Sequence, residues 1–115
     1  MAETSQGQPV PLVQELDPGQ GYQTLLGGSP QTRGMRSGHV RLQPGGEIGL
    51  HSTKGHEETL VFLEGSATVQ LDGGEPLAAG VGTIAYVPPH TGHNVVNSGE
   101  GVLRYIYVVA PVQDA

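Results

Sequence analysis

The amino-acid sequence predicts an all-β domain, either a jelly roll or a closed barrel. Short runs rich in Val, Leu, Ile and Thr alternate with turn-forming residues, and the 19 glycines and 9 prolines among the 115 residues fall between these runs. No window of a dozen residues shows apolar residues at helical spacing without a glycine or proline inside it. Many short strands joined by tight turns are typical of barrels and sandwiches.

Eight strands are predicted, and one barrel domain is expected to contain them all. The Asp72-Gly73 pair is a strong hairpin signal, and Pro88-Pro89 ends a strand. Residues 1–20 are polar and proline-rich, which predicts a leader and a strap that precede a barrel over residues 21–115. The predicted strands are 22–26, 35–42, 47–53, 59–63, 66–71, 83–87, 93–96 and 102–109.

Composition and charge exclude several classes of function. The net charge of −6, with five Lys and Arg in all, leaves no basic patch for a nucleic-acid partner. Apolar stretches such as 106–109 are too short to cross a membrane, and no signal-peptide pattern opens the chain, so a cytoplasmic location is expected. The absence of cysteine means that any bound metal must be held by imidazole and carboxylate groups.

Histidines are concentrated in two short segments. Four of the five lie within residues 50–58 and 88–93. The first segment offers His51 and Glu58, and the second offers His93 from a separate predicted strand. Two imidazoles and a carboxylate that converge from different strands suit one divalent transition metal: Fe, Mn, Ni, Cu, Co or Zn. The alternative, histidines scattered on a solvated surface, is less favoured because the cluster adjoins an acidic pair.

The first segment resembles the first sequence motif of the cupin family, Gly-x5-His-x-His-x(3,4)-Glu-x6-Gly. The matching residues are Gly45, His51, Glu58 and Gly65. One position departs from the motif, because Thr53 stands where the motif has its second histidine. One of the four usual metal ligands is therefore missing.

The second segment resembles the second cupin motif, Gly-x5-Pro-x-Gly-x2-His-x3-Asn. It matches at Gly82, Pro88, His93 and Asn97. His90 replaces the motif glycine, and we expect it to adopt positive φ, which histidine tolerates better than most side chains. The two correctly spaced motifs make the resemblance specific, and it covers roughly residues 35–111.

The resemblance implies a double-stranded β-helix barrel, often dimeric, with a metal inside one mouth. It also implies that His51, Glu58 and His93 are the protein ligands. A set of two histidines and one carboxylate leaves coordination positions open for water, dioxygen or a chelating substrate.

The role of His56 stays open at this point. It lies two residues before Glu58, so strand geometry places both side chains on one face. One interpretation is that His56 replaces the missing fourth ligand. The other interpretation is a solvated turn histidine after the Lys54-Gly55 turn. Thr53 is not a usual metal ligand and offers at most a hydrogen bond to a metal-bound water.

Two further pairs of side chains share a strand face: Tyr105 with Tyr107, and His39 with Arg41. Either pair lines the cavity and contacts an anionic or enolic substrate, or else belongs to ordinary packing or surface. Packing is the favoured interpretation, since binding pockets use few polar groups.

Two classes of function follow. The first is a metal-dependent enzyme of the dioxygenase, isomerase, lyase or decarboxylase type, acting on a small organic substrate. The second is a non-catalytic module that binds a small molecule, a sugar or the metal itself. A homodimer is expected, because runs 59–63 and 103–109 are apolar on both faces in a chain too small to bury both.

Overall fold

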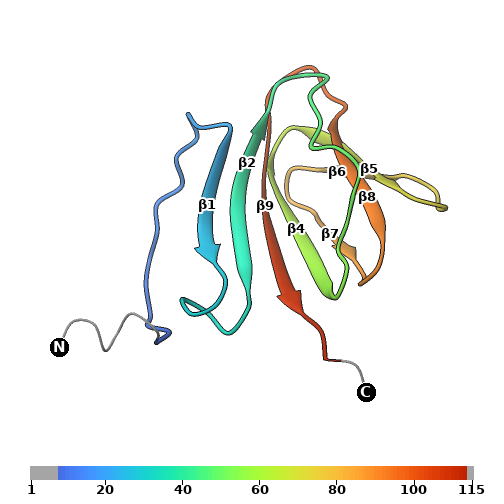
Figure 1. Cartoon of the computed structure of the whole chain (residues 1–115). Helices are drawn as coiled ribbons and strands as arrows, with labels where there is room; N and C mark the ends of the chain where they lie inside the picture. The colour runs from blue at the N-terminus through green and yellow to red at the C-terminus, as the bar shows by residue number, and fades with distance from the viewer. Residues whose placement is uncertain (1–7, 114–115) are drawn as a thin grey trace.

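The computed structural model describes residues 8–113, which form nine β-strands in two sheets (Figure 1). Within this part of the chain there is no helix that is long and apolar enough to cross a membrane. The strands in the two sheets confirm the prediction of an all-β fold. The strands are β1 (Tyr22–Gly27), β2 (Arg36–Leu42), β3 (His51–Ser52), β4 (His56–Glu64), β5 (Ser66–Leu71), β6 (Leu77–Gly80), β7 (Ile84–Val87), β8 (Gly92–Asn97) and β9 (Leu103–Pro111).

The two sheets enclose one apolar core. The larger sheet has the strand order β1-β2-β9-β4-β7 and the smaller one β3-β8-β5-β6, and every neighbouring pair is antiparallel. Alternate residues of each strand face inward. In β4, for example, Glu58, Leu60 and Phe62 are buried while the residues between them are half-exposed. Val69 and Val95 meet them from the smaller sheet.

The predicted strand 47–53 is interrupted in the structure. Its regular part is β3 alone, and Glu47 forms an isolated bridge with Val96 of β8. From this bridge to His51, the segment contains one residue more than the part of β8 that pairs with it. Gly49, at φ +103°, adopts the left-handed conformation that absorbs the extra residue. Apolar patterning could not reveal this break.

The other seven predicted strands agree with the structure within three residues at each end. The prediction missed β6, which pairs with β5. Its sequence, Leu-Ala-Ala-Gly, lacks the β-branched and aromatic residues that mark a strand. Leu77, the largest side chain of this strand, is 40% exposed.

The segment before β1 is tied to the larger sheet by Gln23. The backbone N–H of Asp17 donates to Gln23 Oε1, and Gln23 Nε2 donates to the carbonyl of Glu15.

The neighbouring side chain on β2, His39, is fully buried and accepts a hydrogen bond from Arg104 Nε. Burial, and then the charge of Arg104, lower the pKa of His39, which keeps this imidazole neutral. The division of the chain at residue 20 stays a prediction.

Part of the outward face of the larger sheet is apolar. Val61 pairs with Ile84 on one side and Ile106 on the other, and Ile84 is 67% exposed. Tyr86, in the same strand as Ile84, is 53% exposed. This surface agrees with the argument that led to the expected homodimer, which itself stays a prediction.

Candidate metal centre

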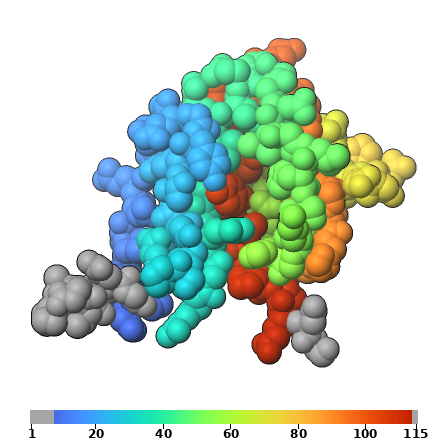
Figure 2. All heavy atoms as spheres, viewed as in Figure 1, coloured from blue at the N-terminus to red at the C-terminus, as the bar shows by residue number. Residues whose placement is uncertain are grey.

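A cavity of about 600 Å³ opens between the β1–β2 hairpin and the segment that carries β3. Figure 2 shows this hollow, with part of β9 visible at its floor. Its volume is within the range of small-molecule sites. The wall residues come from both sheets, so the cavity is the open end of the space that the apolar core fills.

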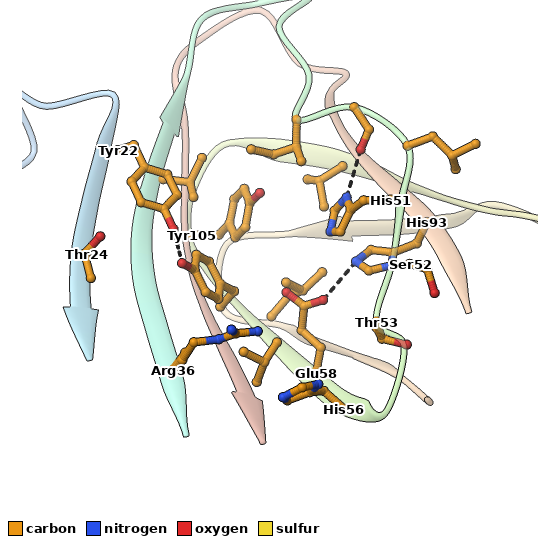
Figure 3. Close-up of a pocket in the computed structure, with 18 of the residues that line it drawn as sticks. Tyr22, Thr24, Arg36, His51, Ser52, Thr53, His56, Glu58, His93 and Tyr105 are labelled. Carbon is orange, nitrogen blue, oxygen red and sulfur yellow. Dashed lines mark hydrogen bonds and ion pairs between the residues drawn. The ribbon is translucent and has the colours of Figure 1, made fainter. Parts of the chain in front are cut away.

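Three separate strands bring His51, Glu58 and His93 together on the wall of this cavity. His51 and His93 are direct partners in the β3–β8 pair, and their ring centroids are 4.3 Å apart. Glu58 approaches from β4 in the other sheet, with its Oε1 2.9 Å from His93 Nε2. One potential ligand atom from each residue lies within 4.8 Å of the others, and Figure 3 shows the three side chains converging. That they bind metal stays a prediction.

Backbone carbonyls hold both imidazoles in one tautomer. His51 Nδ1 lies 2.9 Å from the carbonyl oxygen of Gly49, and His93 Nδ1 lies 3.2 Å from that of Thr91. A carbonyl oxygen only accepts hydrogen bonds, so each Nδ1 carries a hydrogen and donates it. Each Nε2 lone pair is then free to bind a metal. Histidines that bind metals in proteins usually donate their other ring N–H to a protein group in this way.

The environment of His93 Nε2 fits a cation. This buried atom makes no hydrogen bond within residues 8–113, although the Glu58 carboxylate is 2.9 Å away. A neutral Nε2 and a carboxylate oxygen both present lone pairs, so they need a proton or a metal ion between them. Burial lowers the pKa of His93, but Glu58 and the Thr91 carbonyl outweigh burial, and the net shift is upward. The donors therefore fit a divalent transition metal.

We expect bound metal to be released as the pH falls. A raised pKa means that protons begin to compete for His93 Nε2 above the ordinary histidine value of about 6.5. Metal occupancy after dialysis between about pH 8 and pH 4 is the measurement, with circular dichroism to confirm that the protein stays folded. Occupancy that is unchanged at about pH 4 would mean that the histidines are not ligands.

The other candidate residues lie near the group without belonging to it. His56 is half-buried and lines the same cavity, but its side chain is not among the three that converge. Thr53 directs its hydroxyl elsewhere: it donates to the carbonyl of Pro88 at 2.9 Å and accepts from the N–H of Thr91 at 3.2 Å. His90 has φ +57°, so the expected positive φ is confirmed.

We expect Thr53→Ala to lower the free energy of unfolding by about 1–3 kcal/mol, because it removes two part-buried hydrogen bonds, to the Pro88 carbonyl and from the Thr91 N–H. Thr53→Ser keeps the hydroxyl and is the matched control. Denaturant unfolding of the two metal-free variants gives the comparison. An alanine variant as stable as the serine variant would contradict this role for the hydroxyl.

Four polar side chains that line the cavity were not assigned to it from the sequence. Tyr105 and Tyr107 line it, although ordinary packing was the favoured interpretation, and Tyr22 and Arg36 join them from β1 and β2. His39 points to the opposite face of β2 and does not line the cavity. The signal that could have found Arg36 is parity, because it lies four residues before the core residue Val40.

Solved structures similar to this chain include two proteins that are described as cupins. An RmlC-like cupin of Methanocaldococcus jannaschii is 22% identical, with a TM-score of 0.71, and the match covers 90% of this chain and 94% of the other. A Cupin 2 conserved barrel protein of Salinispora arenicola is 21% identical, with a TM-score of 0.72 and coverage of 90% and 91%. The former is described as a double-stranded β-helix, so that predicted fold is confirmed.

A third similar structure is a predicted oxalate decarboxylase of Thermotoga maritima. It is 22% identical, with a TM-score of 0.63, and the match covers 67% of this chain and 66% of that chain. This chain thus spans slightly less than two thirds of that protein. No curated protein matches. The family model of the cupin domain matches residues 38–109, well over half of the sequence. The chain therefore belongs to the cupin family.

Proposed function

We propose that this cupin is a metal-dependent enzyme that acts on a small organic substrate. The observation that carries the proposal is the convergence of His51, Glu58 and His93 within 4.8 Å on the wall of a substrate-sized cavity. A divalent transition metal held there supplies Lewis acidity and open coordination positions to a substrate oxygen or to dioxygen. The reaction is of the dioxygenase, isomerase, lyase or decarboxylase type.

The chain's own groups contribute orientation, charge and exclusion of water. The Gly49 and Thr91 carbonyls fix the two imidazole planes, and Glu58 supplies the negative charge. His93 and Glu58 are buried, whereas His51 is exposed at the cavity mouth. A substrate can therefore reach the site past His51, while the apolar walls behind it keep water away from the carboxylate.

A panel of turnover assays tests the proposal. The protein is stripped with a chelator, loaded separately with each of the six metals, and assayed for dioxygen consumption and for conversion of small keto acids and hydroxy acids. We expect turnover with at least one loaded form and none with the Glu58→Gln variant. Metal-dependent ligand binding without turnover in any assay would favour the alternative, a non-catalytic binding module, over an enzyme.

A further inference from the structure

The cavity wall opposite the metal centre carries a cation. Arg36, at the start of β2, is exposed and lines the cavity, and it forms no ion pair with any acidic residue in the described part of the chain. In Figure 3 its guanidinium extends from β2 into the cavity, toward Glu58. A chain with a net charge of −6 thus directs a positive charge into its pocket.

Strand register fixes the spacing between the backbones of Arg36 and Glu58. Arg36 pairs with Val109 of β9, and Val109 pairs with Glu58 of β4. The three residues form one row across the inner face, so Arg36 and Glu58 lie two strands apart, or about 10 Å from backbone to backbone. The apolar side chain of Val109 lies between Arg36 and Glu58 in this row.

Tyrosine hydroxyls extend the polar wall beside Arg36. The hydroxyls of Tyr22 and Tyr107 hydrogen-bond to each other, which uses one of their two hydrogens and leaves the other to donate. Tyr105 is 2% exposed and lines the cavity. Burial, and then the charge of Glu58, raise the pKa of Tyr105, so this hydroxyl remains a donor.

A glycine makes room for this arrangement. Tyr107 pairs with Gly38 on β2, and a Cβ on Gly38 would lie 2.6 Å from the ring of Tyr107. The ring therefore lies across the bare backbone of β2 and reaches Tyr22 on β1. Without a side chain at position 38, the hydroxyl pair can form on the same wall as Arg36.

We propose that the ligand of this cavity is a small organic carboxylate, held at its anionic end by Arg36 and the tyrosine hydroxyls, with the rest of the molecule lying toward the metal centre. A guanidinium and neutral hydroxyl donors match the acceptor oxygens of a carboxylate. Val40, Leu60 and Val95 line the cavity beside them and suit an apolar body. The proposal rests on the proposed metal centre for the orientation of the ligand, but the anion contact is a property of this chain alone.

The test compares benzoate with benzamide, which has the same shape without the charge. Dissociation constants are measured by protein-observed NMR on zinc-loaded and metal-free protein. We expect benzoate to bind about 10- to 100-fold more tightly than benzamide, in the range of a charge-assisted contact. Arg36→Gln is expected to reduce this ratio to near one. Arg41→Gln is the matched control, because Arg41 lies on the same strand with the opposite parity.

Three results separate the anion site from the metal centre. Preference for benzoate that is lost in Arg36→Gln and kept in both Arg41→Gln and the metal-free protein supports the proposal. Preference that survives Arg36→Gln, or that disappears when zinc is removed, overturns it, because the carboxylate then binds the metal. Failure of zinc to bind while Arg36 still governs the preference supports the carboxylate site and contradicts only the metal centre.

Discussion

Replacement of His93 by alanine is expected to lower metal affinity by more than about 100-fold. This loss exceeds the one expected when a residue that only hydrogen-bonds to a metal ligand is removed. His93 Nε2 is buried, has no hydrogen-bond partner in the described part of the chain, and lies beside the Glu58 carboxylate. Without it, His51 and Glu58 offer only two donors, which hold a divalent ion poorly. Glu58→Gln keeps nearly the same shape and tests the same site without opening a hole, and we expect a similar loss. Competition against a chelator measures the metal affinities of the unchanged protein and of the two variants.

His56→Ala is the matched control for these variants. His56 is an imidazole in the same cavity but lies outside the converging group, so its removal should change affinity little. Circular dichroism of each variant separates loss of a ligand from loss of the fold. Intact metal binding in His93→Ala would end the three-ligand account, and a loss in His56→Ala as large as in His93→Ala would make His56 a fourth ligand.

Gly65→Ala is expected to be the most destabilising single substitution among the motif glycines. Gly65 has φ +88°, which costs an ordinary residue about 1–2 kcal/mol. A Cβ there would also lie 2.4 Å from the carbonyl oxygen of Val102 and 3.0 Å from Leu103 Cα. Both are backbone atoms, so the β4–β5 turn must separate from the start of β9. We expect the free energy of unfolding to fall by about 3 kcal/mol or more.

Gly82→Ala isolates the steric part of that cost. Gly82 has nearly the same φ, +84°, but a Cβ on it would meet no atom of residues 8–113 within 4 Å. This variant should therefore lose only the conformational part, about 1–2 kcal/mol. Chemical denaturation followed by circular dichroism compares the two. Equal losses in both variants would show that the Gly65 turn has room for a side chain.

The three central side chains could be predicted because their positions depend on short-range spacing. His51 lies in a motif with the correct distances to Glu58 and to the flanking glycines, and His93 occupies the matching place in the second motif. The structure supplies the reason why the spacing works: β3 and β8 pair with His51 opposite His93. Local spacing and strand pairing thus agree at the site.

Residues on the opposite wall depend on the register between distant strands. Arg36 faces Glu58 because β2 pairs with β9 and β9 with β4, over sequence separations that spacing alone does not determine. The same holds for Thr53, whose hydroxyl partner at Pro88 is 35 positions away. The residue that replaces the second histidine of the first motif therefore also ties two loops together, which the motif alone does not indicate.

X-ray absorption spectroscopy of the loaded protein, combined with elemental analysis, tests the central claim most directly. The account predicts one divalent metal per chain, coordinated by two imidazole rings and by oxygen. The two rings belong to His51 and His93, and the protein oxygen to Glu58. A spectrum with three imidazoles, or with none, would contradict this ligand set. A metal content far below one ion per chain after loading with each of the six ions would also contradict it.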